Sequence, residues 1–502
     1  MKRKAVILFL LRILKIGLGI LNLSLAAKFF GVSIDRDVWI LAFNTIVILD
    51  AALWGPINET FRAKFIFIKE HEGEEKALAK TKSLLLFTTI VSILVVCFVM
   101  CFPNLLAKII APSFGGEELQ QLLRMIVFVA PCLIINQTVQ IGISILNAYG
   151  SFYIPEISST ITVVLNLILI LLLAPIIGIY SLLASYYAGI IILVVLILIQ
   201  IKKLKINLLS DFTKIQFKDF YPFVLFALPF FFPYFLGQLN AILEKTISSS
   251  LGIGVVSIID YSRKFTDVLL SVISSVLTTI LVPALSLQFM KKEPKKFLTE
   301  FQQIFQIGLL AITFIISILT CCPEAFVKIL YAKGNIEEHI LIQIGQMVRL
   351  YSLTALSIFL YTIFGMALLS SGNGKKYAFW GIMAQLITMM LNILLAQKVG
   401  IYIFPISLFI SHLIIGCIMM NMFPYKNKAF LRTTAKYIGV LIFTIGLMYW
   451  IGRFQFFGLS AFYTILFNTA IITVLLTLQI FIFSLNERLA LTHIFKKIRG
   501  NR

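Results

Sequence analysis

The chain has 502 residues, of which 60% are hydrophobic and only 13% are charged, whereas a soluble globular protein is about 45–50% apolar and about 25% charged. This excess of apolar residues excludes a water-soluble globular protein, and no polar stretch is long enough to form a separate soluble domain. The formal net charge of +21 is a property of many nucleic-acid-binding proteins, but the placement of the basic residues argues against nucleic acid as a partner.

Apolar segments follow one another along the whole chain, and each is long enough to cross about 30 Å of hydrocarbon as a helix. They predict an all-α polytopic membrane protein whose longest polar connections are Arg62–Lys82 and Ile201–Phe220. About fourteen transmembrane helices are predicted, at residues 5–27, 37–59, 83–102, 122–147, 155–174, 178–200, 222–249, 255–288, 301–321, 340–370, 377–396, 401–422, 436–452 and 460–484.

Lysine and arginine residues gather on one side of this series of helices. The N-terminus and alternate connections hold 29 of them, whereas the opposite connections hold only six. Because positively charged connections stay in the cytoplasm, this asymmetry predicts a bacterial inner-membrane protein with both termini cytoplasmic. The membrane topology therefore explains the positive net charge.

An internal repeat divides the chain. The segment 101–110, which begins Cys-Phe-Pro, recurs 220 positions later as 321–330, which begins Cys-Cys-Pro, and both copies precede a Glu-Glu pair. Gly178-Ile179-Tyr180 recurs as Gly400-Ile401-Tyr402 at a shift of 222. Copies with an even number of spans are parallel repeats, which transporters place around a substrate site.

The repeat predicts three segments. They are an N-terminal six-helix lobe at residues 1–215, a C-terminal six-helix lobe at residues 216–425, and two extra helices with a basic cytoplasmic tail at residues 426–502. Duplication with two appended helices is the organisation expected of a transporter that works by alternating access.

Charged residues within apolar helices are expensive, at about 2.5–3.5 kcal/mol each on insertion scales, so they face a cavity or a partner. Asp260, Arg263, Lys264 and Asp267 share one face of the eighth predicted helix because of their i, i+3, i+4, i+7 spacing. The alternative for this stripe is a set of intrahelical ion pairs that only lets the helix lie in lipid. We assign the following residues of helices one, two and seven to the same candidate substrate site, in the cleft between the two halves: Arg12, Lys15, Asn22, Asp37, Asp50, Glu244 and Lys245.

An excess of arginine and lysine favours an anionic ligand, since the guanidinium fork matches phosphate oxygens and the ammonium adds a point charge. An enzyme is not expected, and no catalytic residue is assigned. The chain lacks a Walker-type phosphate loop, the outer connections are too short for a catalytic domain, and the six cysteines have no metal-ligand spacing. No metal site or cofactor is therefore predicted.

Three motifs resemble one known family. They are Phe30-Gly31 followed by Asp37 and Ala42-Phe43, then Tyr261-Ser262-Arg263 with the later segment 279–286, and Lys328-Ile329-Leu330-Tyr331 with Gly334. In order and spacing these residues resemble the MurJ/MviN lipid II flippases of the multidrug/oligosaccharidyl-lipid/polysaccharide exporter superfamily, and the resemblance covers nearly the whole chain.

The resemblance implies a flippase that moves a polyprenyl-diphosphate-linked saccharide from the inner to the outer leaflet. It implies that helices one, two, seven and eight line a cationic cavity, and that the last two helices form a groove for the lipid tail. Arg263 is then the ligand of the diphosphate, and Asp37 keeps the acidic position of the family. The partners expected are an undecaprenyl-diphosphate-linked saccharide and membrane lipid, bound by a monomer.

The sequence also departs from the family. Ile16 and Asn22 stand where the family has arginines on helix one, Asp50-Ala51 replaces an arginine pair on helix two, and Gly55-Pro56-Ile57 replaces a Glu-Gly-Ala turn. An exopolysaccharide or O-antigen repeat unit is therefore the alternative substrate, and a multidrug or cation exporter is the third hypothesis. The driving force is open among the membrane potential and Na⁺ or H⁺ bound by one of five acidic residues: Asp37, Asp50, Glu244, Asp260 or Asp267.

Overall fold

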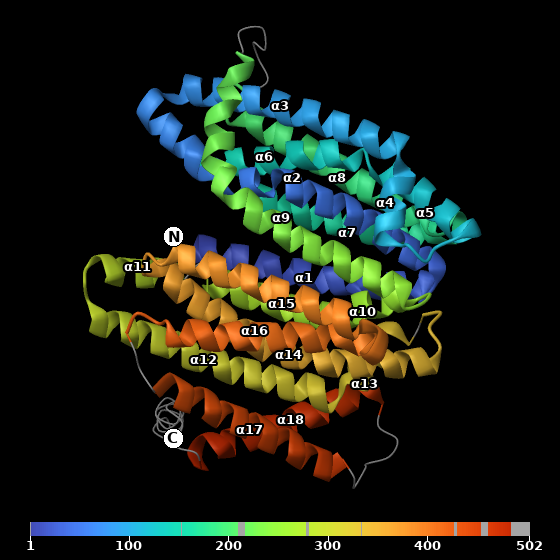
Figure 1. The fold of residues 1–502 in the computed structure, drawn as a ribbon, viewed down its shortest axis with the longest axis vertical. Helices are drawn as coiled ribbons and strands as arrows, with labels where there is room; N and C mark the ends of the chain where they lie inside the picture. The colour runs from blue at the N-terminus through green and yellow to red at the C-terminus, as the bar shows by residue number, and fades with distance from the viewer. Residues whose placement is uncertain are drawn as a thin grey trace. The chain divides into compact units, whose positions relative to one another are not determined.

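The computed structural model describes residues 2–151, 153–208, 216–277, 281–332, 334–425, 429–452 and 460–482. Within these ranges the chain is helical and contains no β-strand (Figure 1). It divides into two compact units, residues 1–257 with 334–336, and residues 258–333 with 337–502. Each unit is described by itself.

The first unit begins with α1 and ends as α10 starts. Its helices are α1 (Lys2–Phe30), α2 (Ile34–Glu72), α3 (Glu74–Cys101), α4 (Pro103–Ile110), α5 (Gly116–Val129), α6 (Cys132–Ala148), α7 (Tyr153–Ile177), α8 (Tyr180–Lys203) and α9 (Tyr221–Ser250). A 3₁₀ turn at Phe217–Phe220 precedes α9.

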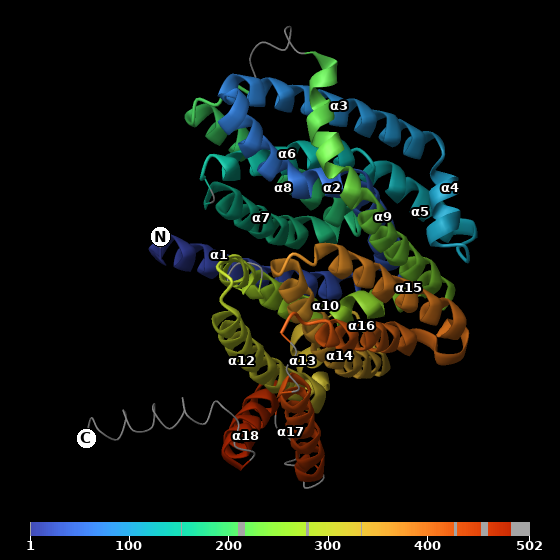
Figure 2. The ribbon, with the colours of Figure 1, turned by 60° about the vertical axis from the view of Figure 1, so that its left-hand side comes forward.

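The second unit takes the chain from α10 to its last helix. Its helices are α10 (Val255–Val276, from Ile258 on), α11 (Val282–Met290), α12 (Pro294–Cys321), α13 (Pro323–Tyr331), α14 (Glu338–Ser370), α15 (Gly374–Val399), α16 (Ile403–Asn421), α17 (Ala429–Gly452) and α18 (Ala461–Ile482). The appended helices α17 and α18 pack on each other and lie side by side in Figure 2.

Each predicted transmembrane segment overlaps a helix, and the all-α prediction is confirmed. In the described part of the chain, eleven helical segments are long and apolar enough to cross a membrane. One of the eleven, Gly374–Asn421, contains both α15 and α16, so the count of fourteen stays a prediction. On α7, Ile168, Leu172 and Ile176 are 49%, 62% and 77% exposed, which is the outward apolar surface that a lipid-facing helix requires.

The predicted polar connection Arg62–Lys82 is helical on both sides of Gly73. α2 extends to Glu72, well beyond the apolar stretch, because Phe61, Phe65 and Ile68 recur on one face and are buried. Gly73 has φ +94° and separates α2 from α3. The apolar stretch of α2 is therefore shorter than the helix, which continues with an amphipathic pattern.

The two copies of the repeated segment have matching helix breaks. Phe102 and Cys322 have φ −126° and −136° with ψ 48° for both, and each ends a long helix. Pro103 and Pro323 then start α4 and α13, since proline suits the first helical position. Gly178 and Gly400 also match, with φ +56° and +65°.

The copies differ at prolines. Pro131 separates α5 from α6, whereas the corresponding α14 is one continuous helix of 33 residues, as expected because proline lacks the amide that an interior turn requires. In the first copy, the 39-residue α2 continues through Pro56.

The compact units do not follow the repeat boundaries. α9, the first helix of the second copy, packs against α2, where Phe223 stacks on Phe61 with ring centroids 5.0 Å apart. The end of the first unit therefore lies at Ser257. The appended helices belong to the second unit, where α17 packs on α12 and α18 packs on α12 and α13. The lobes at 1–215 and 216–425 and the segment 426–502 remain predictions from the repeat.

Candidate functional site

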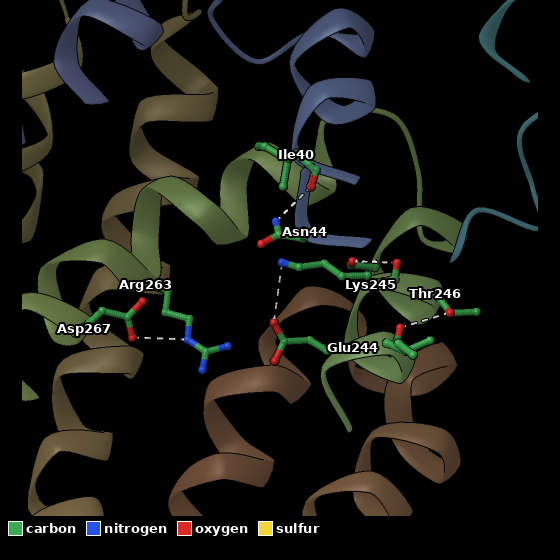
Figure 3. Close-up of polar contacts among 9 residues, drawn as sticks. Ile40, Asn44, Glu244, Lys245, Thr246, Arg263 and Asp267 are labelled. Atoms are coloured by element: carbon green, nitrogen blue, oxygen red, sulfur yellow. Dashed lines mark hydrogen bonds and ion pairs between the residues drawn. The ribbon is translucent and has the colours of Figure 1, made fainter. Parts of the chain in front are cut away.

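The charged stripe of α10 is present as a mixed patch. The Nε of Arg263 donates to Oδ1 of Asp267 across 3.3 Å, and these side chains are 36% and 47% exposed (Figure 3). Lys264 is exposed and Asp260 is half-buried. An ion pair this exposed contributes at most about 1 kcal/mol.

The opposite face of α10 is fixed in the core of the second unit. Tyr261 is fully buried, its backbone oxygen accepts a hydrogen bond from the Tyr331 hydroxyl at 3.2 Å, and the two rings lie 4.9 Å apart. Ser262 is also buried and donates to Ile258 O at 2.6 Å. Two of the family-like motifs therefore pack on each other, and this contact orients Arg263.

In the first unit, Glu244 and Lys245 are adjacent on α9 and half-buried. The Nζ of Lys245 lies 3.8 Å from Oε1 of Glu244, and the side chains are 14% and 17% exposed (Figure 3). The next residue, Thr246, donates to Ile109 O at 2.7 Å, and Ser249 donates to Ile110 O at 2.8 Å. These bonds satisfy carbonyls at the end of α4 and hold α9 in place.

The α1 residues have separate surroundings. The Nζ of Lys15 donates to the Ser159 hydroxyl on α7 at 3.0 Å. The Oδ1 of Asn22 is buried and has no hydrogen-bond partner among the described residues. The Arg12 side chain lies outside the described part of the chain.

Asp37 of α2 is 1% exposed and binds the first turn of α10. Its carboxylate accepts hydrogen bonds from the amides of Gly254 at 2.6 Å and Ser257 at 2.8 Å, and from the Ser257 hydroxyl. A carboxylate at a helix N-terminus satisfies orphan amides and interacts favourably with the helix dipole. In the structure Asp37 therefore positions the start of α10.

The sequence around α10 explains why the cap comes from elsewhere. α2 is capped locally, because the Ser33 hydroxyl accepts from the Arg36 amide at 3.3 Å. At the equivalent position before α10 stands Gly254, which has no side chain and φ +82°. A Cβ there would lie 2.6 Å from Val32 Cγ1, so a capping serine does not fit without a shift of its neighbour.

Asp50, further along α2, has no such partners. Its Oδ1 is buried and lacks a hydrogen-bond partner among the described residues. It lies within electrostatic range of Tyr186, whose hydroxyl donates to Asn136 Oδ1 at 3.0 Å. A buried carboxylate oxygen without a partner is costly, which makes Asp50 a candidate for binding a cation or a proton.

Some of the predicted residues lie together and others do not. Asp260, Arg263, Lys264 and Asp267 share α10, and Glu244 lies beside Lys245, whereas Asp37 and Lys15 contact residues that the sequence did not single out. Gly254 precedes α10 and has no side chain that could cap the helix. This feature of the sequence indicates that the capping acceptor comes from a distant part of the chain. Among the described residues no three histidine, cysteine, aspartate or glutamate side chains are grouped to hold a metal ion.

Comparison with solved structures shows the fold. The chain is similar to a lipid II flippase MurJ in an inward closed conformation, with a TM-score of 0.79, 17% identity, and 95% of this chain and 98% of that one covered. It is also similar to an inward-facing MATE family multidrug transporter of the MOP superfamily, with a TM-score of 0.67, 10% identity, and 84% and 98% covered.

Comparison of sequences shows the family. A probable lipid II flippase MurJ of Aquifex aeolicus (strain VF5) is 24% identical over 444 residues, which cover 86% of this chain and 85% of the relative. The family model described as lipid II flippase MurJ matches residues 26–469, from the end of α1 into α18. The match spans most of the chain, and the chain belongs to the lipid II flippase MurJ family.

Proposed function

We propose that the chain is a flippase that moves lipid II, a polyprenyl-diphosphate-linked peptidoglycan precursor, from the inner to the outer leaflet by alternating access. The family match over residues 26–469 carries this proposal. The protein is proposed to lie in the bacterial inner membrane, and the distribution of basic residues supports cytoplasmic termini. The protein acts as a monomeric carrier without a catalytic step, and it binds membrane lipid and no nucleic acid.

Arg263 is proposed as the main ligand of the diphosphate, assisted by Lys264. The support is geometric: Tyr261 and Ser262 fix one face of α10, while Arg263 and Lys264 lie on a more exposed face. The guanidinium carries five N–H donors in a planar fork, and its Nε–H donates to Asp267. A diphosphate oxygen that replaces Asp267 gains a charge-assisted bond.

The driving force is proposed to act through Asp50 or directly through the membrane potential. A charge that crosses the membrane gains about 2.3 kcal/mol per 100 mV. The unpartnered oxygen of Asp50 supports this residue as the carrier of Na⁺ or H⁺. Asp37, by contrast, already accepts three hydrogen bonds from α10. Transport that stays sensitive to a Na⁺ or pH gradient after Asp50→Asn would overturn the role of Asp50.

Complementation tests the substrate. The full chain, produced in a strain depleted of its own lipid II flippase, is expected to restore growth, and Arg263→Ala with Lys264→Ala is expected to abolish this rescue. Lys296→Ala removes an equal type of charge from an exposed position (its side chain is 67% exposed) and serves as the control. Full rescue by the double variant would exclude the proposed diphosphate ligands.

The alternative substrate predicts a different phenotype. An exopolysaccharide or O-antigen flippase would fail in this complementation, and its deletion would remove surface polysaccharide instead. The family match favours lipid II over this alternative. A cation exporter would change the susceptibility of cells to cationic drugs and would tolerate Arg263→Ala.

A further inference from the structure

A polar pocket of about 230 Å³ lies between α12 and α17 in the second unit. None of its lining residues belongs to the charged stripe of α10 or to the other predicted ligands. The lining residues are Gln302, Phe305 and Gln306 of α12, and Phe430, Arg432, Thr433 and Lys436 of α17.

The base of the pocket is rigid and aromatic. The rings of Phe305 and Phe430 meet edge to face, with centroids 5.6 Å apart at 82°. Both rings are buried, and both also contact Phe301 and Phe364. Such edge-to-face pairs add to the packing of α12 on α17. The polar side chains are therefore carried by two helices that are fixed against each other.

The polar side chains of the pocket present hydrogen-bond donors without partners. Arg432 and Lys436 are exposed, lie one helical turn apart on α17, and form no ion pair with any described residue. Like charges at i, i+4 destabilise a helix, so an anion bound between Arg432 and Lys436 reduces their repulsion. Gln302 and Gln306 are half-buried on α12 and make no hydrogen bond within the described ranges.

This combination fits a phosphate group. Arginine supplies a planar fork of N–H donors, lysine adds three N–H donors, and each glutamine amide adds two more. Phosphate oxygens accept such bonds, and charge assistance makes them about twice as strong as neutral ones. No carboxylate lines the pocket, and the positive charges of Arg432 and Lys436 oppose the binding of a cation there.

The pocket also lies at the depth of lipid headgroups on the basic side of the membrane. α12 starts at Pro294, next to four lysines at 291, 292, 295 and 296. Gln302 is eight residues along α12, about 12 Å along its axis, and Arg432 is in the first turn of α17. The positive-inside asymmetry places this end of both helices at the cytoplasmic surface, where anionic lipids attract arginine and lysine.

We propose that this pocket binds the phosphate headgroup of an anionic glycerophospholipid from the cytoplasmic leaflet. A volume of about 230 Å³ is below the 300 Å³ or so at which sites for drug-sized ligands begin, so a headgroup fits but a lipid-linked sugar does not. The C-terminal tail does not supply the anion for this pocket, because residues 483–502 carry five basic residues and one acidic residue. The inference is independent of the transported substrate.

Native mass spectrometry of the full-length detergent-solubilised protein tests the proposal with phosphatidylglycerol and phosphatidylcholine of identical acyl chains. The protein is expected to prefer phosphatidylglycerol, and Arg432→Gln with Lys436→Gln to lower that preference about 25-fold, because each cation contributes about five-fold near an anionic lipid. Lys295→Gln with Lys296→Gln removes the same charge from exposed positions at the start of α12 and is expected to keep the preference. An equal loss in both double variants would overturn the pocket.

A second variant guards against misfolding. Gln306→Glu places a carboxylate in the pocket, where it pairs with the cations of α17 and keeps the fold, and it is expected to abolish the preference for phosphatidylglycerol.

Two competitors distinguish the possible sources of the phosphate group. Displacement of phosphatidylglycerol by soluble glycerol 1-phosphate at equal concentration would overturn a membrane lipid as the occupant. Stronger binding of undecaprenyl diphosphate than of phosphatidylglycerol, lost in Arg432→Gln with Lys436→Gln, would reassign the pocket to the substrate.

Discussion

The carboxylate of Asp37 accepts hydrogen bonds from both the backbone amide and the hydroxyl of Ser257, which lies 220 residues further along the chain. The amide of Gly254 donates to the same carboxylate. Asp37→Asn replaces one of these acceptor oxygens by a donor that faces other donors in a buried site. We expect a loss of about 2–3 kcal/mol, since hydrogen bonds to charged groups contribute about 1.5–3 kcal/mol each. Thermal unfolding of the purified protein measures this loss.

Asp35 provides the matched control for Asp37. It lies in the same first turn of α2 but is exposed, so Asp35→Asn is expected to change the unfolding temperature by much less. Ser257→Ala removes the hydroxyl and leaves both amide donors, and we expect it to cost less than Asp37→Asn. Equal effects of Asp35→Asn and Asp37→Asn would contradict a specific cap on α10.

Gly31 is expected to resist substitution by alanine because of a close contact. It has φ +57°, and a Cβ there would clash with the backbone oxygen of Asn335. Gly178 has nearly the same φ, +56°, but no atom within 4 Å of such a Cβ. Gly31→Ala is therefore expected to destabilise the protein by at least about 1 kcal/mol more than Gly178→Ala, since both share the backbone strain and only Gly31 has the clash. Thermal unfolding of the two variants compares them directly.

Substitutions at Arg263 and Arg349 are expected to affect different properties: transport for Arg263 and stability for Arg349. Arg349 is held by two contacts, from Nε to Thr320 O at 3.0 Å and from Nη2 to Glu324 Oε1 at 3.1 Å. Arg349→Ala is expected to lower stability by about 1 kcal/mol and to keep transport per folded molecule. Arg263→Ala is expected to keep stability, because its ion pair is exposed, and to lower complementation at least ten-fold. Expression-normalised complementation and unfolding temperatures are the two readouts, and a variant that loses both equally would contradict the assignment.

The turn between α2 and α3 is expected to weaken at alkaline pH. The Tyr149 hydroxyl donates to Glu74 Oε1 at 2.7 Å, and burial together with the neighbouring Glu74 carboxylate raises the pKa of Tyr149 above its usual value of 10.0. A raised pKa means that folding favours the neutral phenol. This stabilisation is complete below pH 10 and is lost as the pH rises through the pKa of the folded state.

Tyr149→Phe separates this effect from general alkaline unfolding. The substitution keeps the ring that lies 3.8 Å from the Nζ of Lys69 and removes only the hydroxyl. The difference in unfolding temperature between wild type and Tyr149→Phe is expected to be constant up to about pH 10 and to shrink above it. A difference that grows with pH would show that the sign is wrong.

Much of the fold could be predicted because length and hydropathy identify membrane helices. The repeated breaks before Pro103 and Pro323 were also predictable, since proline acts locally. The extension of α2 beyond its apolar stretch was missed, although Phe61, Phe65 and Ile68 carry the helical period. α4 and α13 were missed as helices because each has only eight or nine residues, too few for hydropathy to separate from a loop.

The candidate site was predictable along single helices and not across them. Spacing alone placed Arg263 and Asp267 on one face of α10, and the structure joins them. No spacing reveals that Lys15 meets Ser159, or that Asp37 meets Gly254 and Ser257, because tertiary packing brings these residues together. The competing exopolysaccharide substrate rested on missing arginines on helices one and two, and the family match over 26–469 does not favour it.

The cap on α10 makes the second copy depend on the first. With the starts of α2 and α10 aligned at Ile34 and Val255, Ser33 corresponds to Gly254, and Asp37 corresponds to Ile258, whose apolar side chain cannot accept a hydrogen bond. The first copy supplies its own cap at this turn, whereas α10 takes its cap from Asp37 of the first copy. The second copy produced alone would therefore contain a helix whose first amides lack these acceptors.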